Sequence, residues 1–337
     1  MTGERGARRP GRVLTALLCA LTAAGLYGCS GSGPSEPSPT PTTTPATPPP
    51  TAPTGLSPLT GLPARPAPVL AVKIDNVPAA RPHTGLGAAD LVYVEQVEGG
   101  VTRLLAVYSS RLPDLTGPVR SARESDIALL GDFDRPVLAY SGAQSALNPL
   151  LRAAPLDLVT ESTTPGAFRR SADRPAPHNL YLRPGRALAA APGAGEARDI
   201  GFRFGPAPPG GTPVTHTSVR YPAARYTFTW SAADRAWRVA MDGREARATD
   251  TGPLTPETVV VQYVTIRPSR FHDRFGAVSP YSETVGDGRA LVLRDGRAHE
   301  ARWSRPSAAS GTTFTTPAGA PLPFAAGQVW IVLAPKA

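Results

Sequence analysis

The chain of 337 residues carries 35 basic and 26 acidic side chains, and all the basic residues except Lys73 and Lys336 are arginine. This arginine bias most simply reflects a GC-rich genome, and attraction to acidic envelope polymers or anionic lipid is the functional alternative. No basic run with interleaved aromatic residues is present, which argues against nucleic acid as a partner.

The first 28 residues have the layout of a secretory signal peptide. Four arginines precede an apolar run, Val13 to Leu26, which is too short to span a hydrocarbon core of about 30 Å. The segment Leu26-Tyr27-Gly28-Cys29 matches the lipobox pattern of lipoprotein signal peptides. We therefore expect Cys29 to be the first mature residue and to carry fatty acyl groups such as palmitate, which would place the protein on the extracytoplasmic face of the cell membrane. An ordinary secreted protein cut near Gly28 is the alternative.

Residues 29–56 are predicted to be a lipid-anchored tether. Ser30 to Thr54 is almost wholly Pro, Thr, Ser, Ala and Gly, a composition that cannot bury an apolar core and favours extended polyproline II. Such a segment, at about 3.1 Å per residue, would hold the folded part roughly 75 Å from the membrane. Because Cys19 leaves with the signal peptide, one mature cysteine remains. This excludes an intrachain disulfide, a cysteine nucleophile and a thiolate metal site.

Residues 57–205 alternate between strand and helix patterns. Ser121 and Glu124 form a capping box that predicts a helix through Phe133, and Ser141 caps a second predicted helix that reaches about Arg152. Apolar runs bounded by turn residues predict strands over 67–74, 91–97, 101–108, 136–140 and 156–160. We expect the first three strands to share one sheet, the second and third as a hairpin turning at Glu98-Gly99-Gly100. This order predicts an α/β (α+β) N-terminal domain.

A loop rich in proline and glycine follows at residues 206–211, and helical periodicity ends there. We place a domain boundary after residue 205. Asp242-Gly243 and Asp295-Gly296 supply the chemistry of tight turns. Strands are predicted over 225–230, 236–241, 258–266, 290–294, 298–303, 312–315 and 328–333. Residues 206–337 are therefore expected to form a mostly antiparallel, β-rich C-terminal domain.

Several blocks, in this order along the chain, resemble the YerB-like family of bacterial lipoproteins, a domain of unknown function with N-terminal and C-terminal parts. The blocks are Ile74-Asp75-Asn76, Ala80-Arg81-Pro82, Gly85-Leu86, Ala89-Asp90-Leu91-Val92-Tyr93, Val97-Glu98-Gly99-Gly100-Val101-Thr102-Arg103, Gly117-Pro118-Val119-Arg120-Ser121-Ala122-Arg123 and Ala176-Pro177-His178-Asn179-Leu180-Tyr181. The resemblance covers roughly Ser57 to Pro335 and is weaker after the boundary, where Gly286-Asp287-Gly288 and Gly327-Gln328-Val329-Trp330-Ile331 fit best. It implies an envelope lipoprotein in two parts, and it supplies no reaction and no catalytic residue.

The candidate ligand-binding residues are charged and polar groups at strand ends, beside turns or within these blocks: Asp75, Asn76, Arg81, Asp90, Glu95, Glu98, Arg103, Arg120, Ser121, Arg123, His178 and Asn179. The simplest interpretation of the acids is that they pair with the arginines and hold loops in place. Two of them could instead flank a scissile glycosidic bond, about 5 to 9.5 Å apart.

Other chemistries have weaker support in the sequence. No two histidines fall at a metal-ligand spacing, so we expect neither a metal site nor a cofactor. The motifs G-x-S-x-G and S-x-x-K are absent, and neither lysine belongs to a phosphate-binding loop. Ser121 could pair with His178 as nucleophile and base, but a helix cap explains it better.

Three functions remain open: a non-catalytic binding or accessory module for an anionic cell-envelope component, a cell-wall glycan hydrolase with paired carboxylates, and an assembly partner of a membrane-bound cell-wall enzyme. The first is favoured by Arg120 and Arg123, which bracket a predicted helix N-terminus where backbone N–H groups attract anions. In that case replacing either arginine with alanine should weaken binding and leave stability nearly unchanged. If these arginines instead pair internally with Asp90, Glu95 or Glu98, the same changes should destabilise the fold.

Overall fold

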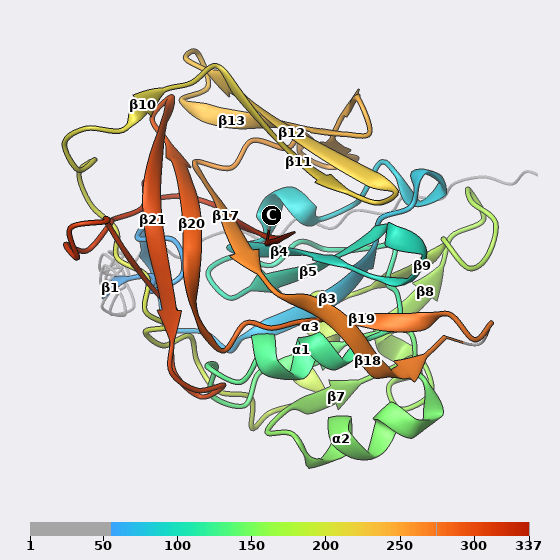
Figure 1. Ribbon diagram of the computed structural model, residues 1–337. Coiled ribbons are helices and arrows are strands. Elements are labelled where there is room, and N and C mark those ends of the chain that lie inside the picture. Colours follow the sequence, from blue (N-terminus) through green and yellow to red (C-terminus); the bar gives the residue numbers. More distant parts are fainter. Residues whose placement is uncertain (1–54, 274, 337) are drawn as a thin grey trace, which may run out of the picture. The chain divides into compact units, whose positions relative to one another are not determined.

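The computed structural model describes residues 55–273 and 275–336, whose helices and strands are labelled in Figure 1. The predicted signal peptide, Cys29 and nearly all of the predicted tether lie outside these residues. The tether prediction runs two residues too far, because Gly55–Leu56 (β1) pair with Pro63–Ala64 (β2) in a short antiparallel ladder. Within the described ranges, no helix combines the length and the apolar character needed to cross a membrane.

An eleven-stranded mixed sheet carries the fold. Its strands run in the order β10-β21-β20-β17-β23-β4-β5-β3-β6-β7, and β22 pairs with β21. They are β3 (Leu70–Asp75), β4 (Leu91–Gln96), β5 (Thr102–Tyr108), β6 (Val137–Ala139), β7 (Asp157–Val159), β10 (Thr212–Pro213), β17 (Thr258–Val264), β20 (Gly286–Arg294), β21 (Arg297–Arg305), β22 (Thr313–Thr315) and β23 (Val329–Pro335). The first three predicted strands share this sheet as expected, with β5 antiparallel to both β3 and β4.

The sheet takes strands from both sides of the loop at residues 206–211. The late strand β23 lies between β17 and β4 and is parallel to both. The described residues belong to one compact unit, so the predicted boundary lies inside a continuous sheet. Separating the two halves there would break the ladder between β23 and β4, and the buried strands on both sides of it would lose their partners.

The helices are shorter than predicted, so the N-terminal half has more strand than helix and the α/β prediction holds only coarsely. Within the described residues there are three α-helices of six residues each: α1 (Glu124–Leu129), α2 (Asn148–Ala153) and α3 (Pro184–Ala189). The capping box predicted at Ser121 is wrong, because the backbone N–H of Ala122 donates to Gly142 O at 3.0 Å and holds this segment as a loop. The helix α1 begins at Glu124, and Asp126 accepts the N–H of Arg123 at 2.7 Å.

The second predicted helix also begins late. Residues Ser145–Leu147 form a 3-10 turn (η4), and α2 starts only after it. The other 3-10 turns are η1 (Pro78–Ala80), η2 (Leu86–Ala88), η3 (Glu98–Gly100) and η5 (Pro165–Ala167). The turn η3 connects β4 to β5 at the predicted hairpin position.

A smaller antiparallel sheet has the order β11-β12-β13-β14. Its strands are β11 (His216–Tyr221), β12 (Ala224–Ser231), β13 (Ala236–Met241) and β14 (Arg244–Glu245). Asp242 and Gly243 both have positive φ, 53° and 80°, as a type I′ hairpin turn requires. The antiparallel prediction therefore holds for this sheet and for the β17-β20-β21 portion of the large one.

Three hairpins escape the sequence prediction. The predicted strand over 258–266 is in fact β17 followed by the start of β18 (Ile266–His272), which pairs with β19 (Val278–Ser282). The others pair β8 (Phe168–Arg170) with β9 (Leu180–Leu182), and β15 (Arg247–Ala248) with β16 (Gly252–Pro253). Most of these strands are short or largely exposed, so their apolar alternation is weak.

The two faces of the large sheet bury separate cores. On one face Val72 and Ala106 pack with Tyr226 and Phe228 of the smaller sheet. On the other face the alternate residues Ala71 and Leu105 pack with Leu129 of α1. Figure 1 accordingly shows the smaller sheet and α1 on opposite sides of β3, β4 and β5. Because side chains alternate along a strand, Lys73 and Asp75 belong to the face that α1 covers.

Candidate functional site

Charged residues meet where β3, β5 and β4 lie side by side. The register pairs Asp75 of β3 with Arg103 of β5, and Arg103 with Glu95 of β4. Residues directly opposite each other project from the same face, so these three and Lys73 all point toward the α1 side. Ionic groups therefore interrupt an otherwise apolar layer next to α1.

Lys73 is fully buried in the middle of β3. Its ammonium group donates to Glu95 Oε1 and, at 2.7 Å, to Asp126 Oδ1 of α1. Burial lowers the pKa of Lys73 to about 8, although the charge and hydrogen bond of Asp126 act in the opposite direction. Lys73 thus ties α1 to the sheet. The sequence analysis missed this role, for which the signal was a lone lysine within an apolar strand.

Arg123 is bound to Glu98 through one edge of its guanidinium group, by two parallel hydrogen bonds. The Nε and Nη2 atoms each donate to a different oxygen of Glu98 at 2.7 Å, and Nη1 donates to Ala122 O at 2.9 Å. Burial acts to raise the pKa of Glu98, but the hydrogen bonds and charge of Arg123, together with the Ser279 hydroxyl, outweigh it and lower the pKa to about 2. The internal pairing that the sequence analysis left open is therefore the arrangement found for Arg123.

Asp75 connects Arg120 with His178. Its Oδ2 atom lies 2.8 Å from Nδ1 of His178 and 3.4 Å from Nε of Arg120. The backbone positions these groups, since Arg120 N–H donates to Lys73 O at 2.8 Å and Asp75 N–H donates to Pro118 O at 2.9 Å. The Arg120 side chain is still 25% exposed, which leaves part of its guanidinium group accessible.

Unlike Arg120 and Arg123, Arg103 pairs with no carboxylate among the described residues. Its Nη1 donates to Ser121 O at 2.9 Å, and no carboxylate within the described ranges lies within 4.0 Å of it. The residue is only 9% exposed. Burial, followed by repulsion from Arg123, lowers the pKa of Arg103 to about 9, so the side chain remains charged at neutral pH. A nearly buried guanidinium group with most of its five N–H donors unused can bind a planar anion.

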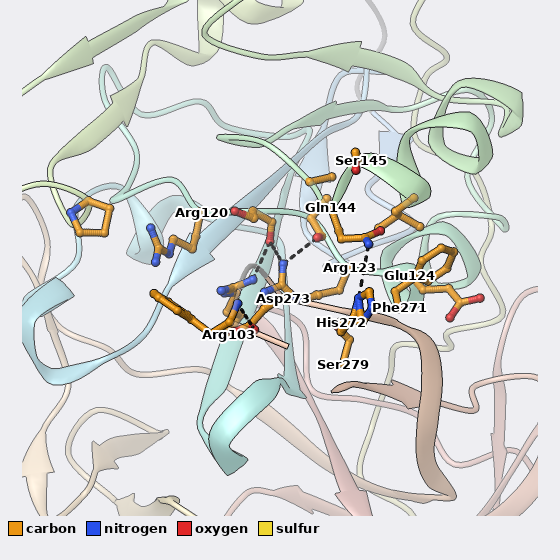
Figure 2. A pocket seen from close by; sticks show the side chains of 16 residues that line it. Arg103, Arg120, Arg123, Glu124, Gln144, Ser145, Phe271, His272, Asp273 and Ser279 are labelled. Atoms are coloured by element: carbon orange, nitrogen blue, oxygen red, sulfur yellow. Dashed lines mark hydrogen bonds between the residues drawn. The ribbon is translucent and has the colours of Figure 1, made fainter. Parts of the chain in front are cut away.

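These arginines line a pocket of about 500 Å³, shown in Figure 2. One side is the loop before α1, with Arg120, Ser121 and Arg123, beside Arg103 of β5. The remaining lining residues were not predicted; Ala122 and Glu124 belong to this same segment, and the others come from elsewhere in the chain: Ala143, Gln144, Ser145, Leu147, Pro177, Phe271, His272, Asp273, Phe275 and Ser279. Five of them lie more than 100 residues away along the chain on the β18–β19 hairpin, so no local sequence pattern could indicate them: Phe271, His272, Asp273, Phe275 and Ser279.

Among the described residues, the charge network around this pocket has four cations, Lys73, Arg103, Arg120 and Arg123, and four carboxylates, Asp75, Glu95, Glu98 and Asp126. The acidic side chains of Glu124 and Asp273 also line the pocket. Recognition here therefore depends on directed hydrogen-bond donors, because there is no large excess of positive charge.

Asn76 and Arg81, two further predicted ligand-binding residues, belong to a network that joins β3 to the smaller sheet. Asn76 Nδ2 donates to Thr102 Oγ1 at 3.0 Å and also to the hydroxyl of Tyr226. Arg81 donates to Asn76 Oδ1 at 3.0 Å and to Asp242 Oδ2 at 2.8 Å. None of these five residues lines the pocket of Figure 2.

Asp90 and Asn179 also lie outside that pocket and hold loops. Asp90 accepts the backbone N–H groups of Ser109 and Ser110 at 2.6 and 2.9 Å. Asn179 Nδ2 donates to Ser171 O at 3.0 Å. In the part of the chain that the structure describes, no group of three or more His, Cys, Asp or Glu side chains is arranged to hold a metal ion.

The chain matches both parts of one protein family. The profile described as "Protein of unknown function (DUF3048) N-terminal domain" matches residues 54–197, and the corresponding C-terminal domain matches residues 217–331. The chain therefore belongs to the DUF3048 family, which confirms the resemblance seen in the sequence blocks.

Two comparisons relate the chain to a protein of Bacillus subtilis. It is 28% identical to "Putative lipoprotein YerB" of strain 168 over 278 residues. This match covers 79% of this chain and 81% of the relative. The structure described as "Crystal structure of YerB protein from Bacillus subtilis" matches with a TM-score of 0.71 and 24% identity, covering 83% of this chain and 96% of that one. At this identity the second comparison shows the shared fold.

Proposed function

We propose that this protein is a membrane-anchored extracytoplasmic lipoprotein that works as a non-catalytic binding module, with the pocket of Figure 2 taking an anionic group of a cell-envelope component. The lipobox at Leu26-Tyr27-Gly28-Cys29 and the tether that follows support this cellular location. The name lipoprotein given to the Bacillus subtilis relative supports it as well. Replacing Cys29 with Ala should therefore move the protein from the membrane fraction to a soluble extracytoplasmic fraction. If labelled fatty acid never enters the native protein, the lipid anchor is refuted.

The observation that carries the binding function is the state of Arg103. Arg123 donates to Glu98 and to backbone carbonyl groups, whereas Arg103 makes one hydrogen bond to the described residues and lines the pocket. Holding a charged guanidinium group at 9% exposure costs solvation free energy. A carboxylate or phosphate oxygen in the pocket would compensate that cost through charge-assisted hydrogen bonds. Arg120, which is partly accessible, offers a second donor group.

The carboxylates near the pocket favour this function over glycan hydrolysis. A glycosidase needs a carboxylic acid that is protonated at working pH, which usually means a raised pKa. The pKa of Glu98 is instead lowered to about 2, and Asp75 is engaged by His178 and Arg120. The carboxyl group whose pKa is raised to about 7 is that of Asp132, and Asp132 does not line this pocket.

The test is retention of the full-length protein on purified cell-wall material, with Arg103→Gln as the principal variant. Hydrogen bonds to charged groups contribute about 1.5 to 3 kcal/mol, so binding should weaken by roughly tenfold to a hundredfold. The matched control is Arg238→Gln, which removes the same charge from an exposed position on the smaller sheet. Arg103→Lys separates fork geometry from charge, since lysine cannot form two parallel bonds to one anion. Equal retention of folded Arg103→Gln and wild-type protein would refute the binding site.

A further inference from the structure

A second unsatisfied group lines the same pocket. The side-chain oxygen of Gln144 is buried and has no hydrogen-bond partner among the described residues, and its Nε2 lies 3.5 Å from Nδ1 of His272. A buried acceptor without a donor costs about 1 to 3 kcal/mol in a folded protein. Gln144 directly precedes η4 and comes from a different segment than the arginines.

Backbone hydrogen bonds hold Gln144 and the arginine loop on neighbouring segments. The N–H of Ser141 donates to Arg120 O, and the N–H of Ala122 donates to Gly142 O, both at 3.0 Å. Figure 2 shows Gln144 and the arginines around one pocket. One ligand could therefore meet the unused N–H donors of Arg103 and the unused acceptor of Gln144 at the same time.

Such a ligand must combine an anion with a hydrogen-bond donor. A phosphate group offers the anion, and a phosphodiester has no donor on the phosphate itself. The last residue of a peptide offers both, because its α-carboxylate and its own amide N–H are attached to the same Cα atom. Leu147, Phe271 and Pro177 add apolar surface to the lining that could receive a small side chain.

The charge balance argues in the same direction. A polyanion would meet Glu124 and Asp273 in the lining, in addition to carboxylates that already neutralise the cations. A single carboxylate adds one negative charge beside Arg103 and avoids most of that repulsion. The pocket, at about 500 Å³, is within the usual size of small-ligand sites.

From this arrangement we propose that the pocket binds the free C-terminus of a peptide, with Arg103 and Arg120 on the carboxylate and Gln144 accepting the amide N–H of the terminal residue. The inference rests on the proposed function and specifies its ligand. Arg103 and Arg120 bind the anion, and Gln144 distinguishes a peptide from other anions.

The experiment compares three resins of equal ligand density with the purified full-length protein at about 0.15 M salt. The first displays trialanine coupled through its amino group, the second displays the same peptide as its C-terminal amide, and the third displays a phosphate monoester. We expect at least tenfold stronger retention on the free carboxylate than on either other resin. Arg103→Gln should abolish most of that preference, and Arg238→Gln should leave it unchanged.

The variant Gln144→Leu makes the test specific. Among the described residues this side chain makes one long hydrogen bond, at 3.5 Å, so its replacement should leave the thermal midpoint close to that of the wild type. We expect retention on the trialanine resin to fall about three- to tenfold, because a neutral hydrogen bond is lost, and retention on the phosphate resin to stay the same. If Arg103→Gln does not fold, Arg103→Lys replaces it as the variant without a guanidinium fork.

The outcomes separate the two proposals. Arg103-dependent retention on phosphate without preference for trialanine would overturn the peptide inference and leave the anion site standing. Equal retention on the carboxylate and amide resins, or no effect of Gln144→Leu on the trialanine resin, would also overturn the inference. Failure of all three resins to retain the protein, together with unchanged retention of Arg103→Gln on cell-wall material, would refute both proposals.

Discussion

Two neighbouring parts of one charge network differ in how their cations are paired. In the closed part, Lys73 is bound by Glu95 and Asp126, and Arg123 is bound by Glu98, so these cations have carboxylate partners within hydrogen-bond distance. In the open part, Arg103 has a backbone carbonyl as its partner, and Arg120 shares Asp75 with His178. Residue type is the same in both parts, since Arg103 and Arg123 are both arginines.

The difference shows that an arginine becomes a structural or a binding group through its partners. A paired guanidinium group holds loops, and its removal leaves a carboxylate buried without compensation. An unpaired guanidinium group beside a cavity costs solvation free energy in the unliganded protein and becomes favourable when an anion arrives. Replacing a residue of the closed part should therefore lower the stability of the fold more than replacing one of the open part. Replacing a residue of the open part should weaken ligand binding more.

The largest effect is expected at Lys73, in the closed part. Lys73→Met leaves the carboxylates of Glu95 and Asp126 buried without their cation and should lower the free energy of unfolding by about 3 to 5 kcal/mol. Urea denaturation of the purified protein measures this change. Adding Glu95→Gln to the same protein should recover part of the loss, because one buried charge is then removed. A single variant as stable as the wild type would mean that the ammonium group does not hold α1 to the sheet.

A smaller contrast is expected between the two arginines. Arg123→Gln breaks the two-pronged pair with Glu98 and should cost about 2 kcal/mol of stability, since these are hydrogen bonds between charged groups. Arg103→Gln removes no ion pair and should cost less than about 1 kcal/mol. The sequence alone predicts that Arg123→Ala leaves stability nearly unchanged, but the pair with Glu98 makes a loss of stability the expected result. Thermal melting of both variants at one pH decides the matter, and equal losses would remove the distinction between the closed and the open part.

The smallest effect concerns acid. Because the pKa of Glu98 is lowered from 4.5 to about 2 in the folded protein, the unfolded chain binds more protons between these values. The stability that this carboxylate contributes is therefore complete above about pH 4.5 and is lost as the pH falls toward 2. The difference in unfolding free energy between the wild type and Glu98→Gln should shrink over that range. A difference that stays constant from pH 6 to pH 3 would show that the pair with Arg123 is absent in solution.

Local sequence signals succeeded where the structure is local. The hairpin at Glu98-Gly99-Gly100, the turns at Asp242-Gly243 and Asp295-Gly296, and the buried strands β3, β4 and β5 all follow from apolar patterns and turn chemistry over a few residues. The helix at Ser121 failed because the competing hydrogen bond, from Ala122 to Gly142, comes from a distant segment. No local pattern contains that information.

The amino-acid sequence by itself predicted the export signal and lipobox, and it gave the family, most strands of the large sheet, and Asp75, Glu95 and Arg103 as candidate site residues. The strand register then placed those three residues opposite one another. Tertiary structure alone decided that β23 joins both halves into one sheet, and that Gln144 and the β18–β19 hairpin complete a pocket around the arginines. It also decided which arginine is paired and which is open. The reason is physical: periodicity and turns act between neighbours in the chain, whereas ion pairs and pockets depend on distances across the fold that the chain order does not encode.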